Sequence, residues 1–293
     1  MRLVFLLICS LLARAYYAQQ FVDVLKLSYR LSPNNEMLEH EGETVDINDY
    51  MVNIFLPFEQ ADKTYIFAGA NYFSSSIGDF DVYSLSLYGG FSGHIQRESV
   101  GGWQYTTLLI PKISLDGGKI VSKDAQIGAY TLFRKKKSEK FKWKVGAYMN
   151  TERFGFLLVP IIGLEWQANE SYKVDITAPM SASVRKTLND KMMLGLQFTG
   201  RRYSYNISRS AEYLEVGDNT VNLYTDIYLT GKVVLNLQVG HSILRNYGIY
   251  NDGDDVIISF GPVDLQDDRP SPRNELSQGW NFRGGLFYRL AAN

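Results

Sequence analysis

Alternation of apolar and polar side chains, repeated in segments of about ten residues along nearly the whole chain, most constrains the fold. The clearest case is 280–290, where Trp280, Phe282 and Leu286 share one face of a strand. Arg283 and Arg289 lie on the opposite face. One such segment also fits a soluble sheet above a core, but its recurrence behind an export signal predicts a closed barrel, apolar outside and polar inside.

The first residues have the features of a secretion signal. Arg2 is followed by an apolar run over 3–12, and Ala13, Ala15 and Ala18 are small residues suited to cleavage. A run of about ten apolar residues is too short to cross a bilayer. We therefore expect a cleaved signal peptide over 1–18 and one outer-membrane barrel domain over 19–293.

Composition excludes several classes of protein. The 30 basic and 31 acidic side chains nearly cancel, which argues against a nucleic-acid partner. Cys9 is the only cysteine and lies in the expected signal, so the mature chain would have neither disulfides nor thiol chemistry. No later segment reaches the roughly 18 apolar residues of a membrane-spanning helix. A membrane location therefore requires strands, because only helices and closed barrels satisfy their backbone groups in lipid.

The alternation and the turn residues predict thirteen strands. The best are 50–58, 141–150, 221–230, 233–242 and 280–290, and a single long one is expected over 171–187. Single-chain bacterial barrels have even strand numbers. We expect about 12 strands if 21–31 is not a full wall strand, or 14 if 255–260 adds one. The segment 156–166 is apolar on both faces at first, so its faces stay unassigned.

Three stretches carry a family resemblance: 154–166 (FGFLLVPIIGLEW), 178–184 (APMSASV) and 285–290 (GLFYRL). With them the chain resembles an uncharacterised, porin-like family of Gram-negative outer-membrane β-barrels, a domain of unknown function. The resemblance covers nearly the whole mature chain. It implies an all-β, single antiparallel transmembrane barrel that is known by its fold and has no assigned activity.

Strand parity selects candidate site residues. Polar side chains expected to line the lumen have mixed charge, as in a narrow polar channel or in an interior filled by ion pairs. Aromatic side chains on the other face fit girdles at the two lipid interfaces. The lumen candidates are Lys144, Glu165, Asp175, Arg201, Asp226, Gln238 and Arg283, and the interface candidates are Trp103, Trp143, Trp166, Trp280 and Tyr288.

Catalysis is not expected. His241 and Ser242 are adjacent on a predicted strand, so they point to opposite faces and cannot form a hydrolase pair. We expect no metal and no cofactor. The acidic segment 251–268 could hold a divalent cation between lipopolysaccharide head groups, but it lacks the spacing of a calcium loop, and a solvated acidic loop is the default.

These patterns predict an outer-membrane protein that is a narrow passive channel or a transport-related pore. One alternative is a structural or surface-binding barrel without a pore. A second is a secreted soluble β-sandwich that acts as a binding module. The barrel would contact outer-membrane lipid, lipopolysaccharide and the barrel insertion machinery; its oligomeric state is left open.

Overall fold

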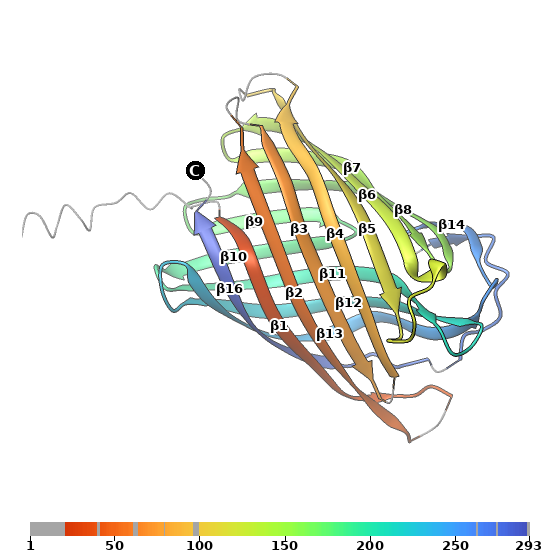
Figure 1. Ribbon diagram of the computed structural model, residues 1–293. Coiled ribbons are helices and arrows are strands. Elements are labelled where there is room, and N and C mark those ends of the chain that lie inside the picture. Colours follow the sequence, from red (N-terminus) through yellow and green to blue (C-terminus); the bar gives the residue numbers. More distant parts are fainter. Residues whose placement is uncertain are drawn as a thin grey trace, which may run out of the picture.

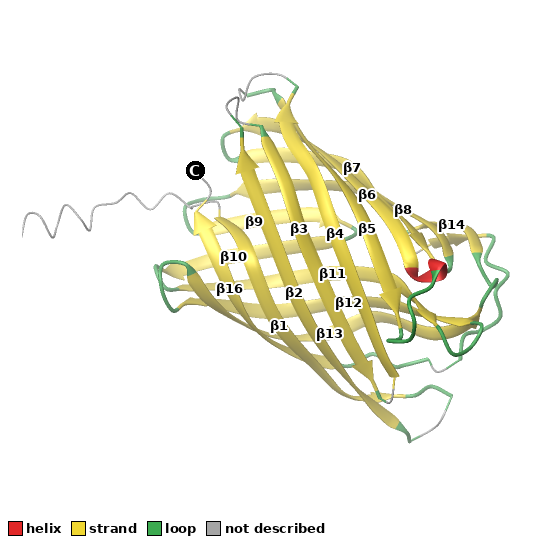
Figure 2. Ribbon diagram, viewed as in Figure 1, coloured by secondary structure: helices red, strands yellow, loops and turns green. Residues whose placement is uncertain are grey.

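In the computed structural model the chain forms a closed antiparallel β-barrel (Figure 1). The structure describes residues 21–39, 42–60, 64–78, 80–95, 100–261, 263–273 and 275–291, and the expected signal peptide over 1–18 lies outside them. In this described part of the chain, helix is limited to one 3-10 turn, Ser122–Asp124 (Figure 2). Within the described residues no helix is long and apolar enough to cross a membrane.

Neighbouring strands in the wall follow the order of the chain, and β8–β9 and β1–β16 pairings close it. Of the sixteen strands in the described residues, β14 (Val256–Phe260) pairs with the edge of β8 and β15 (Val263–Leu265) pairs with β14, which leaves fourteen in the wall. The wall strands are β1 (Phe21–Glu36), β2 (Thr44–Glu59), β3 (Tyr65–Ile77), β4 (Phe80–His94), β5 (Trp103–Leu115), β6 (Ala125–Ser138), β7 (Phe141–Glu152), β8 (Gly155–Gln167), β9 (Tyr172–Ala178), β10 (Ser181–Asn189), β11 (Met192–Ile207), β12 (Glu212–Tyr228), β13 (Val233–Asn251) and β16 (Trp280–Ala291).

The all-β barrel is therefore confirmed, with fourteen strands and not the first estimate of 12. The strand expected over 171–187 is two strands, because the chain turns at Pro179 between β9 and β10. Proline has no backbone N–H for a ladder hydrogen bond and favours such breaks. Neither proposed reason for the uneven count was right, since β1 is a full wall strand and β14 (Val256–Phe260) lies outside the wall.

The two ends of the barrel differ. We call the end with Phe21 and Ala291 the terminal end; apart from the link from β4 to β5, the links described there are tight turns, such as that between β12 and β13. The opposite, far end carries the long segment 252–279, which includes β14 and β15 (Val263–Leu265). On the outer face of the wall large apolar side chains are exposed, and on the inner face polar side chains are buried. Strand alternation produces both rows.

Candidate functional site

The barrel interior is the candidate functional site, and one group of predicted lumen residues is close together there. Lys144 Nζ lies 2.8 Å from Asp175 Oδ1 and 3.3 Å from Glu165 Oε1. Arg134 adds a contact of 3.2 Å to Glu165. Adjacent strands β6 to β9 position all four, and Glu165 faces Asp175 directly in the ladder. The two carboxylates are held together by the two cations between them.

A second group forms where β12, β13 and β16 meet. Arg289 Nη1 donates to Asp226 Oδ2 at 2.9 Å and Arg289 Nε donates to Asp23 at 2.6 Å. Asn236 donates to Asp226 at 2.6 Å, and Gln238 donates to Asn236 at 2.7 Å. Asp226 and Gln238 are thus connected through Asn236, a link that strand parity alone could not reveal.

Arg201 and Arg283 differ from the other five lumen candidates. Within the described residues, neither side chain has a hydrogen bond or an ion pair. Arg283 lies opposite Arg30 in the β1–β16 ladder and opposite Gln238 in the β13–β16 ladder. Lining of a water-filled lumen by the seven candidates stays a prediction.

The far end is crossed by a three-stranded ribbon that we call the extension: residues 200–207 of β11, 212–219 of β12 and 243–251 of β13. Pairing of β11 with β10 ends at Thr199, and pairing of β13 with β16 ends at His241. Freed from both neighbours, the ribbon can leave the wall. A bulge beside Asn219 accompanies the change of direction.

Both faces of the extension are buried, which does not happen to a wall strand with one face toward lipid. Tyr213, Leu214, Glu215 and Val216 are consecutive and all buried. One face packs with inner-face residues of β2 and β4, and the other packs with β8 and β14. The first cluster is Ile47, Val82, Tyr205, Ile207, Leu214, Val216, Tyr247 and Leu276; the second is Phe154, Leu157, Val159, Tyr213, Tyr250 and Val256.

The second cluster explains why segment 156–166 is apolar on both faces at first. Leu157 and Val159 point inward against the extension, while Phe156 and Ile162 are exposed on the outer face. The strand therefore has a dry inner face at its far half. Its inner face becomes polar at Glu165, near the terminal end.

A buried ionic network ties the first face of the extension to β1 and β2, and sequence reasoning missed it. Arg30 donates to Asp49 at 2.5 Å and to Asp218 at 2.6 Å. Arg245 lies 3.6 Å from Asp218, which also accepts a hydrogen bond from Ser242. The predicted strands 221–230 and 233–242 stopped short of Asp218 and Arg245, and only the folding-in of the extension brings this part of β12 to β1.

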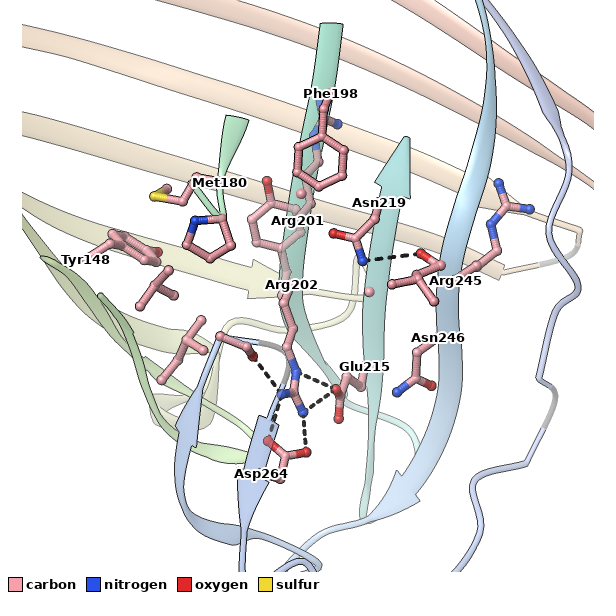
Figure 3. Close-up of a pocket in the computed structure, with 18 residues that line it drawn as sticks. Tyr148, Met180, Phe198, Arg201, Arg202, Glu215, Asn219, Arg245, Asn246 and Asp264 are labelled. Carbon is pink, nitrogen blue, oxygen red and sulfur yellow. Dashed lines mark hydrogen bonds and ion pairs between the residues drawn. The ribbon is translucent and has the colours of Figure 1, made fainter. Parts of the chain in front are cut away.

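A second network joins the extension to segment 252–279, whose β14–β15 hairpin we call the cap. Arg202 binds Asp264 through two hydrogen bonds of 2.7 and 2.8 Å, and Arg202 Nε donates to Glu215 at 2.7 Å (Figure 3). Arg269 donates to the other oxygen of Glu215 at 2.7 Å. Glu215 is fully buried. Paired guanidinium and carboxylate groups of this geometry are strong and directional.

The cap occupies a gap in the wall. β9 pairs with β8 only from Ile162 to Gln167, so the far half of β8 has a free edge. β14 pairs with that edge in parallel, from Gly155 to Leu158. Ile257, Val263 and Leu265 of the cap are exposed. The cap thus replaces the missing part of the wall next to the short β9–β10 hairpin.

A cavity of about 600 Å³ lies where cap, extension and wall meet (Figure 3). Its apolar lining includes Leu157, Val159, Met180 and Phe198, and Arg202 with Glu215 borders it on one side. The cavity therefore gives the cap and the extension empty space beside them, and the hydrogen-bond ladder of the wall need not change for them to use it.

Three of the six aspartates in the acidic segment 251–268 are paired with basic side chains: Asp252, Asp264 and Asp267. Asp252 is bound by Lys123 and Arg153, and Asp267 accepts from Arg269 at 2.8 Å. Within the described part of the chain, no group of three or more histidine, cysteine, aspartate or glutamate side chains is placed to hold a metal ion. The structure therefore gives no support to the cation-binding alternative.

Acid should loosen the cap. The hydrogen bond from Lys123 lowers the pKa of Asp252, and that from Arg269 lowers the pKa of Asp267. Since folding depresses both pKa values, the stabilisation is complete above the unfolded value of about 3.9 and is lost as pH falls through the lower folded values. After correction for the intrinsic rate, amide hydrogen exchange of residues 252–269 should accelerate between about pH 4 and pH 2. Exchange of the β3 and β4 amides should not accelerate over that range. Unchanged protection of residues 252–269 would contradict this prediction.

The aromatic candidates lie on the outer face. Trp143, Trp166 and Tyr288 are exposed, and with Trp103 they lie near the terminal end. Phe141 pairs with Trp166 in the β7–β8 ladder, and Lys135 pairs with both Trp103 and Trp143 in the ladders of β5, β6 and β7. Trp280 lies toward the far end, against the His241 ring at 5.2 Å. Their role as lipid-interface girdles stays a prediction.

His241 and Ser242 lie on opposite faces of β13. The His241 ring packs against Trp280, while the Ser242 hydroxyl donates to Asp218 inside the barrel. The pair therefore does not form a nucleophile and base.

Comparison with solved structures returns outer-membrane barrels. The chain is similar to the COG4313 outer membrane channel from Pseudomonas putida F1, with 7% identity, 93% of this chain and 98% of that chain covered, and a TM-score of 0.47. It is also similar to the NanC porin, with 6% identity, 91% and 100% covered, and a TM-score of 0.39. A third is the beta domain of the Bordetella autotransporter BrkA, with 12% identity, 92% and 100% covered, and a TM-score of 0.32.

No curated protein matches the sequence. A family model, "Domain of unknown function (DUF6268)", matches residues 100–253 of the 293. The match runs from the start of β5 through β13 and includes the extension. The predicted resemblance to an uncharacterised porin-like barrel family is confirmed, and the chain belongs to the DUF6268 family.

Proposed function

We propose that this protein is an outer-membrane transport channel that rests in a closed state. The observation that supports it most is the far end of the lumen, which is filled by the extension and the cap. The extension has lost its ladder pairing with β10 and β16, and the cap joins the wall only through the short parallel pairing of β14 with β8; side-chain packing and ion pairs hold both in place. They can move while the fourteen-strand barrel stays intact.

The outer membrane fits the surface of the barrel. The exposed apolar row and the aromatic side chains at the terminal end are typical of a lipid-facing wall. Bacterial barrels have short periplasmic turns and longer outer loops. The tight turns at the terminal end and segment 252–279 at the far end therefore orient the closed end toward the outside. No catalysis is part of the proposal.

A structural barrel without a pore is the competing function. Burial of Glu215 and of the apolar clusters on both faces of the extension favours it, because such packing resembles a permanent plug. The two functions differ in whether weakening the contact between cap and extension lets ions pass.

Glu215→Gln should raise ion conductance in planar bilayers. The change removes the charge shared by Arg202 and Arg269 and leaves two guanidinium groups without full compensation. Removing one partner of a buried ion pair costs about 3–5 kcal/mol. We expect few or brief openings in the wild type and frequent openings in the variant.

Glu139→Gln is the matched control, because Glu139 pairs with Lys136 at an exposed turn of the terminal end. Heat-modifiable gel mobility verifies that each variant folds. A folded Glu215→Gln variant with as little conductance as the wild type would favour the structural barrel. Asp264→Asn, which removes the ion pair between the cap and Arg202, gives an independent second variant.

A further inference from the structure

We propose that the lumen binds small oxyanions through basic side chains that have no acidic partner. Seven carboxylates on the inward-facing side of the strands are each paired with a cation: Asp23, Asp49, Glu152, Glu165, Asp175, Asp218 and Asp226. Within the described residues, four interior bases have no ion pair: Lys173, Arg185, Arg201 and Arg283. The surplus charge of the lumen is therefore positive.

Two of these bases lie at a cavity of about 200 Å³ near the terminal end. Its lining is Phe21, Lys173, Asp175, Ser183, Arg185 and Tyr224. Within the described residues Asp175 forms no ion pair with Lys173 or Arg185, and its Oδ1 is bound by Lys144 at 2.8 Å. Arg185 lies over the Phe21 ring, 4.5 Å from its centroid. Two cations and two hydroxyl groups thus surround a space of small-anion size.

The other two bases lie deeper. Arg283 is opposite Arg30 in the ladder, and like charges in that position repel. Arg30 is bound to Asp49 and Asp218, so neither carboxylate is left for Arg283. Arg201 is opposite Asp218, whose oxygens are bound by Arg30 and Ser242. An interior cation without a partner is costly, and such groups commonly mark ion or substrate paths.

The ligand class follows from the donors. Three of the four bases are arginines, whose planar guanidinium presents paired N–H groups that match the oxygens of a carboxylate or phosphate. Ser183 and Tyr224 add hydroxyl donors at the terminal-end cavity. The shared chemistry is a small anion with two or more oxygens, entering from the terminal end.

Phosphate binding tests the site without requiring an open pore. We would titrate inorganic phosphate into the full barrel in detergent by calorimetry, at constant ionic strength with chloride as the balancing anion. Two double variants should each weaken phosphate binding at least tenfold: Lys173→Gln with Arg185→Gln, and Arg201→Gln with Arg283→Gln. Lys119→Gln, in an exposed far-end loop, should leave the affinity unchanged.

The transport role of the site rests on the proposed channel, but its binding does not. If the wild type binds phosphate and the two double variants do not, the site is supported even when no variant conducts ions. Absence of conductance would contradict only the channel. Absence of phosphate binding to the wild type, or equal affinity in all folded variants, would overturn the site. Arg201→Lys with Arg283→Lys should restore part of the affinity, which a purely structural role would not predict.

Discussion

Leu286→Arg should prevent stable folding or insertion of the barrel. Leu286 is exposed on the outer face of β16 and lies between Leu27 of β1 and Leu235 of β13 in the ladder. An arginine on the lipid face near the bilayer midplane costs about 2–4 kcal/mol, and less near an interface. The expected result is loss of the compact, heat-modifiable band and of membrane-extracted protein.

Arg283→Gln is the matched control on the same strand. Arg283 points inward. Within the described residues it has no carboxylate partner, so the change leaves no buried carboxylate without its counterion. Three buried carboxylates that could pair with it are already bound: Asp226 by Arg289, and Asp49 and Asp218 by Arg30. We expect near-normal folding. If arginine is tolerated at position 286 while glutamine at 283 abolishes folding, the two faces are reversed and the barrel is wrongly assigned.

Most of the wall could be predicted from the sequence because alternation is a local property. Each wall strand with one apolar face was found near its observed place, and parity placed Lys144, Glu165 and Asp175 on faces that the fold brings together. The wall strand that was missed depends on Pro179. Its missing N–H could have signalled the turn between β9 and β10, but the unbroken alternation around it concealed the break.

The far end could not be predicted, because there the pattern reports contacts between distant segments. Tyr213 to Val216 are buried on both faces, so alternation no longer tells inside from outside. The partners of Arg30 and Arg202 are more than ten residues away in sequence and come together only when the extension leaves the wall. Periodicity carries no information on such a change of direction.

A reversible disulfide between the extension and segment 252–279 tests the closed channel most directly. Ile249 and Arg273 form an antiparallel bridge with hydrogen bonds of 2.9 and 3.2 Å in both directions. Such pairs have Cα atoms about 5.5 Å apart, within the range that a disulfide spans. Cys9 is the only native cysteine, and expression without 1–18 removes it, so Ile249→Cys with Arg273→Cys can be locked without competing thiols.

The measurement is single-channel conductance of this double variant in planar bilayers, oxidised and then reduced on the same membrane. Acidic conditions at about pH 3, or the added Glu215→Gln change, provide the openings that oxidation should suppress. We predict that oxidation abolishes the openings and that reductant restores them, while the wild type does not respond to either. Openings that continue unchanged in the oxidised protein, or silence in both states with Glu215→Gln present, would contradict a channel closed by these segments.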